Sequence, residues 1–291
     1  MNYILFDLEW NQPATPEAAL TQPLCLTGEI IEIGAVKLDD HFRLIDERKL
    51  YIRPQYYTKL HRKIASLTHI SDKTLQAEGK PFPEAFRDFQ EWCGEEYAYM
   101  TWSLSDLPVL IDNMLLHGID VSRLPVCYDV QRMFLREILR ENRRVSLDHA
   151  LEILGVKGDQ AHDALHDARN TALVCDHLDL EAYGGEYAAQ AFAEQPLTAG
   201  YDSEHALLTD EGLLRFACPW CGTEAVCEPW IRQSREDYMS MAVCEDGDEF
   251  YVHLEILKAG NRYYPRRVFY EMSDDLYEVY QDAKEARMPV G

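Results

Sequence analysis

The first hydrophobic residues of the chain form a short continuous run that acidic residues then interrupt. Residues 3–6 (YILF) read as a buried β-strand, and the strand pattern continues through Asp7 and Glu9. Side chains two positions apart on a strand point to the same side of the sheet. Two carboxylates held that close repel each other unless a cation lies between them. The pattern therefore predicts a divalent metal ion at the end of the first strand.

Further strands and a series of helices follow in the hydrophobic pattern. β-Branched residues and turn signals predict strands at 28–40, 48–54 and 97–102. Residues 126–134 lead from a strand into a helix. Apolar residues at helical spacing predict helices at 58–76, 82–94, 107–118, 146–155 and 163–184. Three early strands followed by alternating strands and helices indicate an α/β fold, a mixed sheet with helices on both faces.

The pattern changes after residue 185. Residues 186–210 contain Pro196 and Gly200 and read as a connecting segment, and residues 211–291 read as short strands around cysteines. We therefore expect an α/β domain over 1–185 and a small β-rich domain over 211–291.

Composition places the chain among globular proteins. Its 291 residues are 47% apolar, which is enough for a sizeable core, and no apolar run is long enough to cross a bilayer. The start, MNYILFDLEW, lacks a basic region and a small-residue cleavage site, so we expect no signal peptide. Eight irregularly spaced cysteines are typical of reduced thiols or metal ligands. These features predict a cytoplasmic protein without a membrane partner.

The charge of the chain is strongly acidic. The net charge of −23 comes from 28 basic and 51 acidic residues, and this argues against a general nucleic-acid binder with a basic surface. An enzyme that acts on short polyanions needs only a local basic path, so the charge does not exclude a nuclease.

Further acidic residues follow later strands and begin later helices. Asp106 comes just after a predicted strand, and His162 and Asp167 flank another helix start. Strand ends and helix N-termini converge at the usual sites of α/β proteins. Asp7, Glu9, Asp106 and Asp167 would together form a pocket of hard oxygen ligands that suits Mg²⁺ or Mn²⁺.

The spacing of His162 and Asp167 restricts where the histidine can lie. Five residues apart on one helix, they would point about 140° from each other. They can share a site only if His162 lies in the loop before the helix, where an imidazole can act as a general base. His162 and His166, at i and i+4, also have the spacing of a zinc-binding pair.

This combination of motifs resembles the DEDDh 3′-to-5′ exonucleases. The chain has Asp-x-Glu at the end of the first strand, Asp106 after a later strand, and His-Asp-Ala-Leu-His-Asp at 162–167. The segments EIIEIGAV, LTHIS and WSLSD are also similar to that family, over roughly residues 1–185. The Trp-x-x-x-Asp form of the second motif is most similar to the RNA-trimming members. The resemblance implies a ribonuclease-H-like fold with a mixed five-stranded sheet.

The resemblance also implies a reaction and roles for these residues. A pair of Mg²⁺ or Mn²⁺ ions would lie in the site, with Asp7 bridging both. Glu9 and Asp167 would complete one ligand shell, Asp106 would hold the second ion, and His162 would deprotonate the attacking water. The substrate would be the 3′ end of single-stranded RNA or DNA, and the products nucleoside 5′-monophosphates.

Two groups of residues are candidates for substrate binding. The family usually has threonine after the Asp-x-Glu pair, where this chain has Trp10 and then Asn11. Trp10 either stacks on a base, which contributes about 1–3 kcal/mol in single-strand binders, or packs within the fold. Arginines on one face of a predicted helix either bind phosphates or form a solvated face with Glu137 and Glu141. These arginines are Arg132, Arg136, Arg140, Arg143 and Arg144, of which we assign Arg136 and Arg140 to the substrate.

The C-terminal cysteines predict a zinc-ribbon-like domain with a structural Zn²⁺. The segment CPWCG at 218–222 has the form of a zinc knuckle, with ligands Cys218 and Cys221. Cys244 lies in a turn-like stretch and is the expected third ligand. We assign Cys227 as the fourth ligand, and Asp246 and His253 are alternatives. A degenerate ribbon with free thiols is the competing interpretation.

Two alternative functions remain open at this point. One is an oligoribonuclease restricted to very short RNA, which suits the acidic composition. The other is a non-catalytic nucleic-acid-binding or adaptor protein on the same fold. The complete carboxylate set argues against the second, because clustered acids are costly without a metal.

Overall fold

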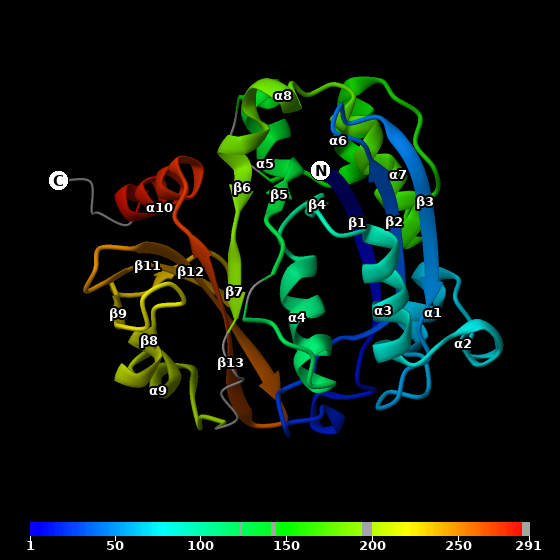
Figure 1. Cartoon of the computed structure of the whole chain (residues 1–291). Helices are drawn as coiled ribbons and strands as arrows, with labels where there is room; N and C mark the ends of the chain where they lie inside the picture. Colours follow the sequence, from blue (N-terminus) through cyan, green and yellow to red (C-terminus); the bar gives the residue numbers. More distant parts are fainter. Residues whose placement is uncertain (123, 141–143, 194–199, 287–291) are drawn as a thin grey trace. The chain divides into compact units, whose positions relative to one another are not determined.

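The chain folds into two compact units (Figure 1). The computed structural model describes residues 1–122, 124–140, 144–193 and 200–286. The first unit comprises residues 1–14, 28–119 and 125–188, and the second comprises 15–27, 120–124 and 189–291. Two short segments of the N-terminal half thus belong to the second unit, which a division of the chain at residue 185 did not anticipate.

The first unit is built on a mixed six-stranded sheet. Its order is β3-β2-β1-β4-β5-β6, with β1 antiparallel to β2 and parallel to β4. The strands are β1 (Asn2–Asn11), β2 (Glu29–Leu38), β3 (Leu44–Tyr51), β4 (Tyr97–Thr101), β5 (Cys127–Asp129) and β6 (Ala188–Ala189). The predicted mixed α/β fold is confirmed. The sheet has one strand more than expected, and this strand, β6, has only two residues.

Helices cover both faces of this sheet. In chain order they are α1 (Arg62–Thr68), α2 (Asp72–Glu78), α3 (Phe82–Cys93), α4 (Asp106–Leu116), α5 (Val130–Phe134), the π-helix η2 (Leu135–Leu139), α6 (Leu147–Leu154), α7 (Ala164–Cys175), α8 (Leu180–Tyr183) and the 3-10 helix η3 (Gly184–Tyr187). On β1, Phe6 contacts Phe89 of α3, whereas Leu5 packs with residues of α5, α6 and α7. Since side chains alternate along a strand, Asp7 and Glu9 lie on the same face as Leu5, the face that α7 covers.

Two predicted helices end earlier than their apolar spacing indicated. The helix expected over 58–76 is divided into α1 and α2, because His69 adopts a left-handed backbone with φ 58°. The arginine-bearing helix ends at Leu139, and Arg140 after it is also left-handed with φ 54°. Arg140 therefore does not continue the helix that carries Arg132 and Arg136, and Arg143 lies outside the described residues.

The second unit is a larger antiparallel β-structure than the zinc ribbon that the sequence suggested. Its sheet has the order β7-β13-β12-β11-β9-β8, and β10 pairs with β11. Its elements are η1 (Pro16–Ala18), β7 (Ala191–Ala193), α9 (Glu204–Leu208), η4 (Glu211–Leu214), β8 (Arg215–Ala217), β9 (Glu224–Cys227), β10 (Ile231–Arg232), β11 (Asp237–Cys244), β12 (Glu249–Ala259), β13 (Arg262–Glu271) and α10 (Asp274–Ala286). Phe216, Phe250 and Phe269 form the aromatic centre of its core.

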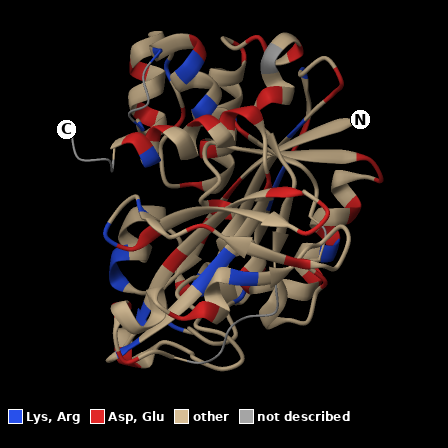
Figure 2. Cartoon of the chain, turned by 90° about the vertical axis from the view of Figure 1, so that its left-hand side faces the viewer, with Lys and Arg blue, Asp and Glu red and all other residues tan. Residues whose placement is uncertain are grey.

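The charged residues are spread over the fold. Figure 2 shows acidic segments in helices, strands and loops alike, with basic segments scattered among them. Within the described part of the chain, none of the helices is both long and apolar enough to cross a bilayer.

Candidate active site

The first two carboxylates lie where β1 runs past the end of its neighbour. The pairing of β1 with β4 covers only Asn2 to Leu5, so the edge of β1 is open on that side from Phe6 onward. Asp106, the first residue of α4, fills this position. Its Oδ1 accepts a hydrogen bond from the backbone N–H of Leu8 at 3.2 Å, and its side chain is buried. The carboxylate of Asp106 thus meets β1 between Asp7 and Glu9.

The third part of the site comes from α7 and the loop before it. His162 lies in that loop with a left-handed backbone, φ 67°, and its N–H donates to Asp167 Oδ2 at 2.9 Å. One ligand atom from each of Glu9, His162 and Asp167 lies within 4.8 Å of the others. The ring of His166 instead lies beside the carbonyl of Gln160, at 3.2 Å, so the structure does not bring His162 and His166 together as a zinc pair.

Gly34 allows α7 to approach the sheet at this point. Gly34 is paired with Asp7 in the β1–β2 register. A Cβ at position 34 would lie 2.0 Å from both the carbonyl carbon of Ala164 and the backbone nitrogen of Leu165. The first turn of α7 therefore rests directly on the backbone of β2, which sets the position of Asp167 over β1.

Polar contacts hold the same turn of α7 in place. Glu32, paired with Glu9 across the strands, is fully buried, and its Oε1 accepts from the N–H of Ala164 at 3.0 Å. Lys49 of β3 lies 3.2 Å from the same oxygen and also donates to Asp163, which caps α7. Glu32 of β2 and Lys49 of β3 thus connect two neighbouring strands to the helix that carries Asp167.

We expect replacement of Lys49 by methionine to lower the free energy of unfolding by about 2 kcal/mol, because Glu32 and Asp163 would lose their cation. Urea unfolding measures this change. The control is Lys80→Met, whose partners Glu84 and Asp88 lie at the surface, where an ion pair contributes about 1 kcal/mol or less. Equal losses in the two variants would contradict the proposed role of Lys49.

The carboxylates of the site are strongly perturbed. Burial, and then repulsion by Asp106 and Asp167, raises the pKa of Asp7 well above its ordinary value. Burial and neighbouring carboxylates raise the pKa of Glu9 to about 8. Burial also raises the pKa of Asp106 to about 7, against the hydrogen bond from Leu8, and it raises the pKa of Asp167. The four groups therefore cannot all ionise at neutral pH unless a cation offsets their repulsion.

This donor set fits hard divalent cations. All four side chains offer carboxylate oxygens, the ligands that Mg²⁺ and Mn²⁺ prefer. The main charge effects on Asp7 and Glu9 come from other carboxylates, and Lys49 is engaged by Glu32 and Asp163. Within the described residues, the second carboxylate oxygen of Glu32 is buried without a hydrogen-bond partner. A bound cation would relieve the repulsion among the four carboxylates.

The two residues after Glu9, Trp10 and Asn11, make contacts mainly within the fold. The ring of Trp10 lies against Gly28, where a Cβ would be 2.7 Å from Cδ1 of the indole. Asn11 is fully buried, and its amide bonds to the backbone of Tyr57, Lys59 and His61. Gly28 thus covers part of the Trp10 ring, and Trp10 as a whole remains partly exposed to solvent.

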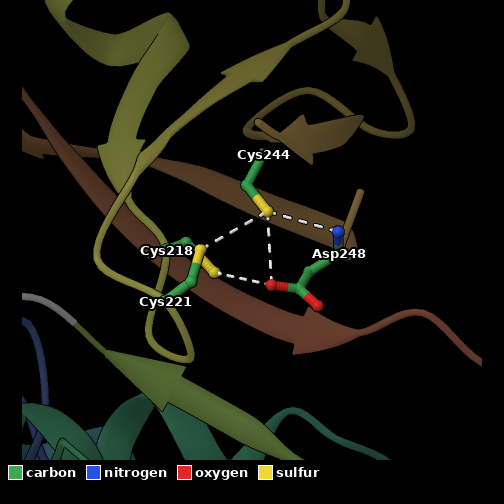
Figure 3. A group of neighbouring side chains, drawn as sticks. All are labelled: Cys218, Cys221, Cys244 and Asp248. Carbon is green, nitrogen blue, oxygen red and sulfur yellow. Dashed lines mark hydrogen bonds between the residues drawn. The ribbon is translucent and has the colours of Figure 1, made fainter. Parts of the chain in front are cut away.

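The cysteine ligands predicted in the second unit are only partly brought together. Cys218, Cys221 and Cys244 lie side by side, and the fourth member of their group is Asp248 (Figure 3). Cys227 does not belong to this group, and neither do Asp246 and His253.

Comparison with known proteins defines the class to which this fold and site belong. The first unit has a ribonuclease-H-like architecture. A family model described as RNase_T: Exonuclease matches residues 6–175, more than half of the chain. The chain therefore belongs to this exonuclease family, and its first unit contains the exonuclease domain.

Solved structures agree with this assignment at the level of the fold. Cell-death related nuclease 4 (CRN-4) is 19% identical with a TM-score of 0.52, over 68% of this chain and 72% of that chain. The nuclease domain of 3′hExo, a DEDDh family member bound to rAMP, is 21% identical with a TM-score of 0.51, over 63% and 92%. A 3′-exonuclease that recognises the 3′ end of a histone mRNA stem-loop is 19% identical with a TM-score of 0.51, over 67% and 87%. A comparison with curated protein sequences gave no significant match.

Proposed function

We propose that this chain is a metal-dependent 3′-to-5′ exonuclease that releases nucleoside 5′-monophosphates from single-stranded RNA or DNA. The observation that carries the proposal is the meeting of carboxylates from β1, α4 and α7 beside a loop histidine. The polarity is supported by the named properties of two similar structures, one with bound rAMP and one that recognises an RNA 3′ end.

Each residue of the site has a distinct part in this proposal. Asp7 would contact two Mg²⁺ or Mn²⁺ ions, Glu9 and Asp167 would complete the ligand set of one, and Asp106 would hold the other directly or through water. When bound, such ions neutralise charge on the attacked phosphate and on the leaving oxygen. A hydrogen bond from the backbone N–H of Leu8 orients the carboxylate of Asp106, and one from the backbone N–H of His162 orients the carboxylate of Asp167.

In this proposal His162 accepts a proton from the attacking water. Its ring is exposed, and one of its ring nitrogens is among the ligand atoms that lie within 4.8 Å of Glu9 and Asp167. As water attacks phosphorus, the bond to the O3′ of the preceding nucleotide breaks, the O3′ takes up a proton from solvent, and the terminal nucleotide leaves with its 5′-phosphate. The imidazole then returns its proton to solvent.

Replacement of His162 by alanine is expected to lower kcat by about 10²–10⁴-fold, the usual contribution of a general base. Mn²⁺ binding should be retained, because the four carboxylates remain. His166→Ala is the matched control, since its ring contacts the Gln160 carbonyl, and its kcat should stay near that of the wild type. An unchanged kcat in His162→Ala would remove the general-base assignment.

Digestion of 5′-labelled single-stranded RNA and DNA with Mg²⁺ or Mn²⁺ tests the proposed function. The proposal requires a ladder of products shortened from the 3′ end, and none with Asp7→Asn. Absence of a ladder on every substrate would favour a non-catalytic binding protein.

A preference for very short RNA is a second candidate, which the net charge of −23 favours. An acidic enzyme holds long polyanions poorly, whereas a dinucleotide contacts only the site. Dinucleotides would then be cleaved faster than 20-mers in the same assay.

Contacts from Trp10, Arg136 and Arg140 to the substrate are also part of the proposal. Replacement of these side chains by alanine would then raise the KM for the nucleic acid.

A further inference from the structure

We propose that the second unit binds one Zn²⁺ through Cys218, Cys221, Cys244 and Asp248, with the carboxylate of Asp248 as the fourth ligand. This metal site is separate from the proposed nuclease function. Figure 3 shows the four side chains pointing toward one another from two turns of the chain.

Each of the two turns closes with a left-handed glycine whose N–H bonds back to a cysteine carbonyl, four residues earlier in the first turn and three residues earlier in the second. In the turn between β8 and β9, the N–H of Gly222 donates to the carbonyl of Cys218 at 2.9 Å. In the turn between β11 and β12, the N–H of Gly247 donates to the carbonyl of Cys244 at 3.1 Å. Both glycines are left-handed, with φ 75° and 91°, which tightens each turn around its ligands. The two turns are neighbours because β9 pairs with β11.

Backbone N–H groups point at two of the sulfurs. The N–H of Trp220 donates to Cys218 Sγ at 3.4 Å, and the N–H of Asp248 donates to Cys244 Sγ at 3.2 Å. Such donors favour a negatively charged sulfur, and a thiolate is the form of cysteine that binds metal. Each turn thus presents a sulfur that accepts a backbone hydrogen bond.

The distances match a tetrahedral zinc site. Zn–S bonds of about 2.3 Å and Zn–O bonds of about 2.0–2.2 Å place ligand sulfurs about 3.8 Å apart and sulfur about 3.5 Å from oxygen. The sulfurs of Cys221 and Cys244 are 3.7 Å apart, and Asp248 Oδ2 is 3.2 Å from the sulfurs of Cys218 and Cys244. Three thiolates select Zn²⁺ over the hard cations that suit the nuclease site.

The structure explains why Cys227 is not the fourth ligand. Cys227 pairs with Ala242, two positions along the strands from the Cys244–Ala225 pair and so about 7 Å away. Its side chain is buried in the core cluster of the second unit. His253 is also excluded, since its ring lies 3.3 Å from Asp237.

A zinc ion at this position would link two hairpins of one sheet. Cys218 and Cys244 also belong to the buried core of the unit, so the metal would support the packing of β8, β9, β11 and β12. Since such a site does not exist in the unfolded chain, zinc binding contributes to the folding free energy of this unit.

The test is zinc titration of the stripped full-length protein with Mg²⁺ in excess, so that the nuclease carboxylates do not compete, together with the absorption spectrum of the Co²⁺ form. We expect one Zn²⁺ per chain and sulfur-to-cobalt charge-transfer bands. Asp248→Asn should bind Zn²⁺ at least about tenfold more weakly, since even partners of metal ligands contribute that much.

Two further variants keep the result interpretable if Asp248→Asn folds poorly. Asp248→Cys should retain one Zn²⁺ and show the Co²⁺ spectrum of a four-sulfur site. Cys227→Ser should bind Zn²⁺ as tightly as the wild type. The proposal is overturned if the wild type gives no thiolate–cobalt bands, if folded Asp248→Asn binds Zn²⁺ as the wild type does, or if Cys227→Ser loses the metal.

Discussion

Replacement of Asp7 by asparagine is expected to abolish nucleotide release while making the metal-free protein more stable at pH 8. The loss of activity should reach at least about 10³-fold, because a carboxylate that contacts both ions supports several kcal/mol of charge stabilisation. The gain in stability has a separate cause, which is the removal of one charge from a group of mutually repelling carboxylates.

The sign of the pH dependence follows from the raised pKa values. In the folded, metal-free protein Glu9 has a pKa of about 8 and Asp106 of about 7, whereas both are close to 4 in an unfolded chain. The folded state therefore holds protons that the unfolded state releases. The contribution of these two groups to the folding stability is therefore fully present below about pH 4, and it is lost as pH rises through about 8. Because an asparagine side chain carries no charge, this loss should be smaller in the Asp7→Asn variant.

The measurement is the unfolding temperature at pH 5.5 and 8.5 in buffers without Mg²⁺ or Mn²⁺. Added Mg²⁺ should restore the stability of the wild type at pH 8.5 and have a smaller effect on Asp7→Asn. Asp88→Asn is the control, since Lys80 lowers the pKa of Asp88 and its loss brings no gain at pH 8.5. If Asp7→Asn were less stable than the wild type at pH 8.5, Asp7 would not lie among repelling carboxylates.

Replacement of Gly34 by alanine is expected to lower both activity and stability. The added Cβ would lie 2.0 Å from two backbone atoms of α7, in Ala164 and Leu165, and backbone cannot move aside as a flexible side chain can. The helix must shift, which costs about 3 kcal/mol in a packed core. A shift of about 1 Å also displaces Asp167 and His162, and such misplacement lowers rates about 10²-fold.

Gly185→Ala provides the matched comparison, because a Cβ there meets no atom within 4 Å. Urea unfolding and kcat should both stay near wild-type values in Gly185→Ala and fall in Gly34→Ala. Wild-type kcat in Gly34→Ala would show that the close approach of α7 to β2 does not position the site.

The parts of the site that the sequence predicts are those that depend on local pattern. Asp7 and Glu9 follow a buried strand at the spacing of one face, and His162 and Asp167 flank a helix start. Glu32, Lys49 and Gly34 act through the register of three strands, which no local spacing reveals. A signal for Glu32 and Gly34 was nevertheless present, since both lie in the family-like segment EIIEIGAV.

Other features of the fold could not be predicted from the sequence because they depend on long-range strand pairing and on turn geometry. The apolar spacing over 58–76 is continuous, yet a left-handed His69 divides the helix. The sequence does not point to Asp248, because thiols and imidazoles are the favoured zinc ligands, and only the folded turn beside Cys244 places its carboxylate among the sulfurs. β7 joins the C-terminal sheet by pairing with β13, far along the chain, so the size of that unit could not be read from short strand signals.

The most direct test of the central claim is an anomalous difference map from a crystal soaked with Mn²⁺ and adenosine 5′-monophosphate. We expect two manganese peaks beside Asp7, one also contacting Glu9 and Asp167 and the other nearest Asp106. A map that shows the phosphate of adenosine 5′-monophosphate at the site but no manganese at these carboxylates would contradict the proposed metal site.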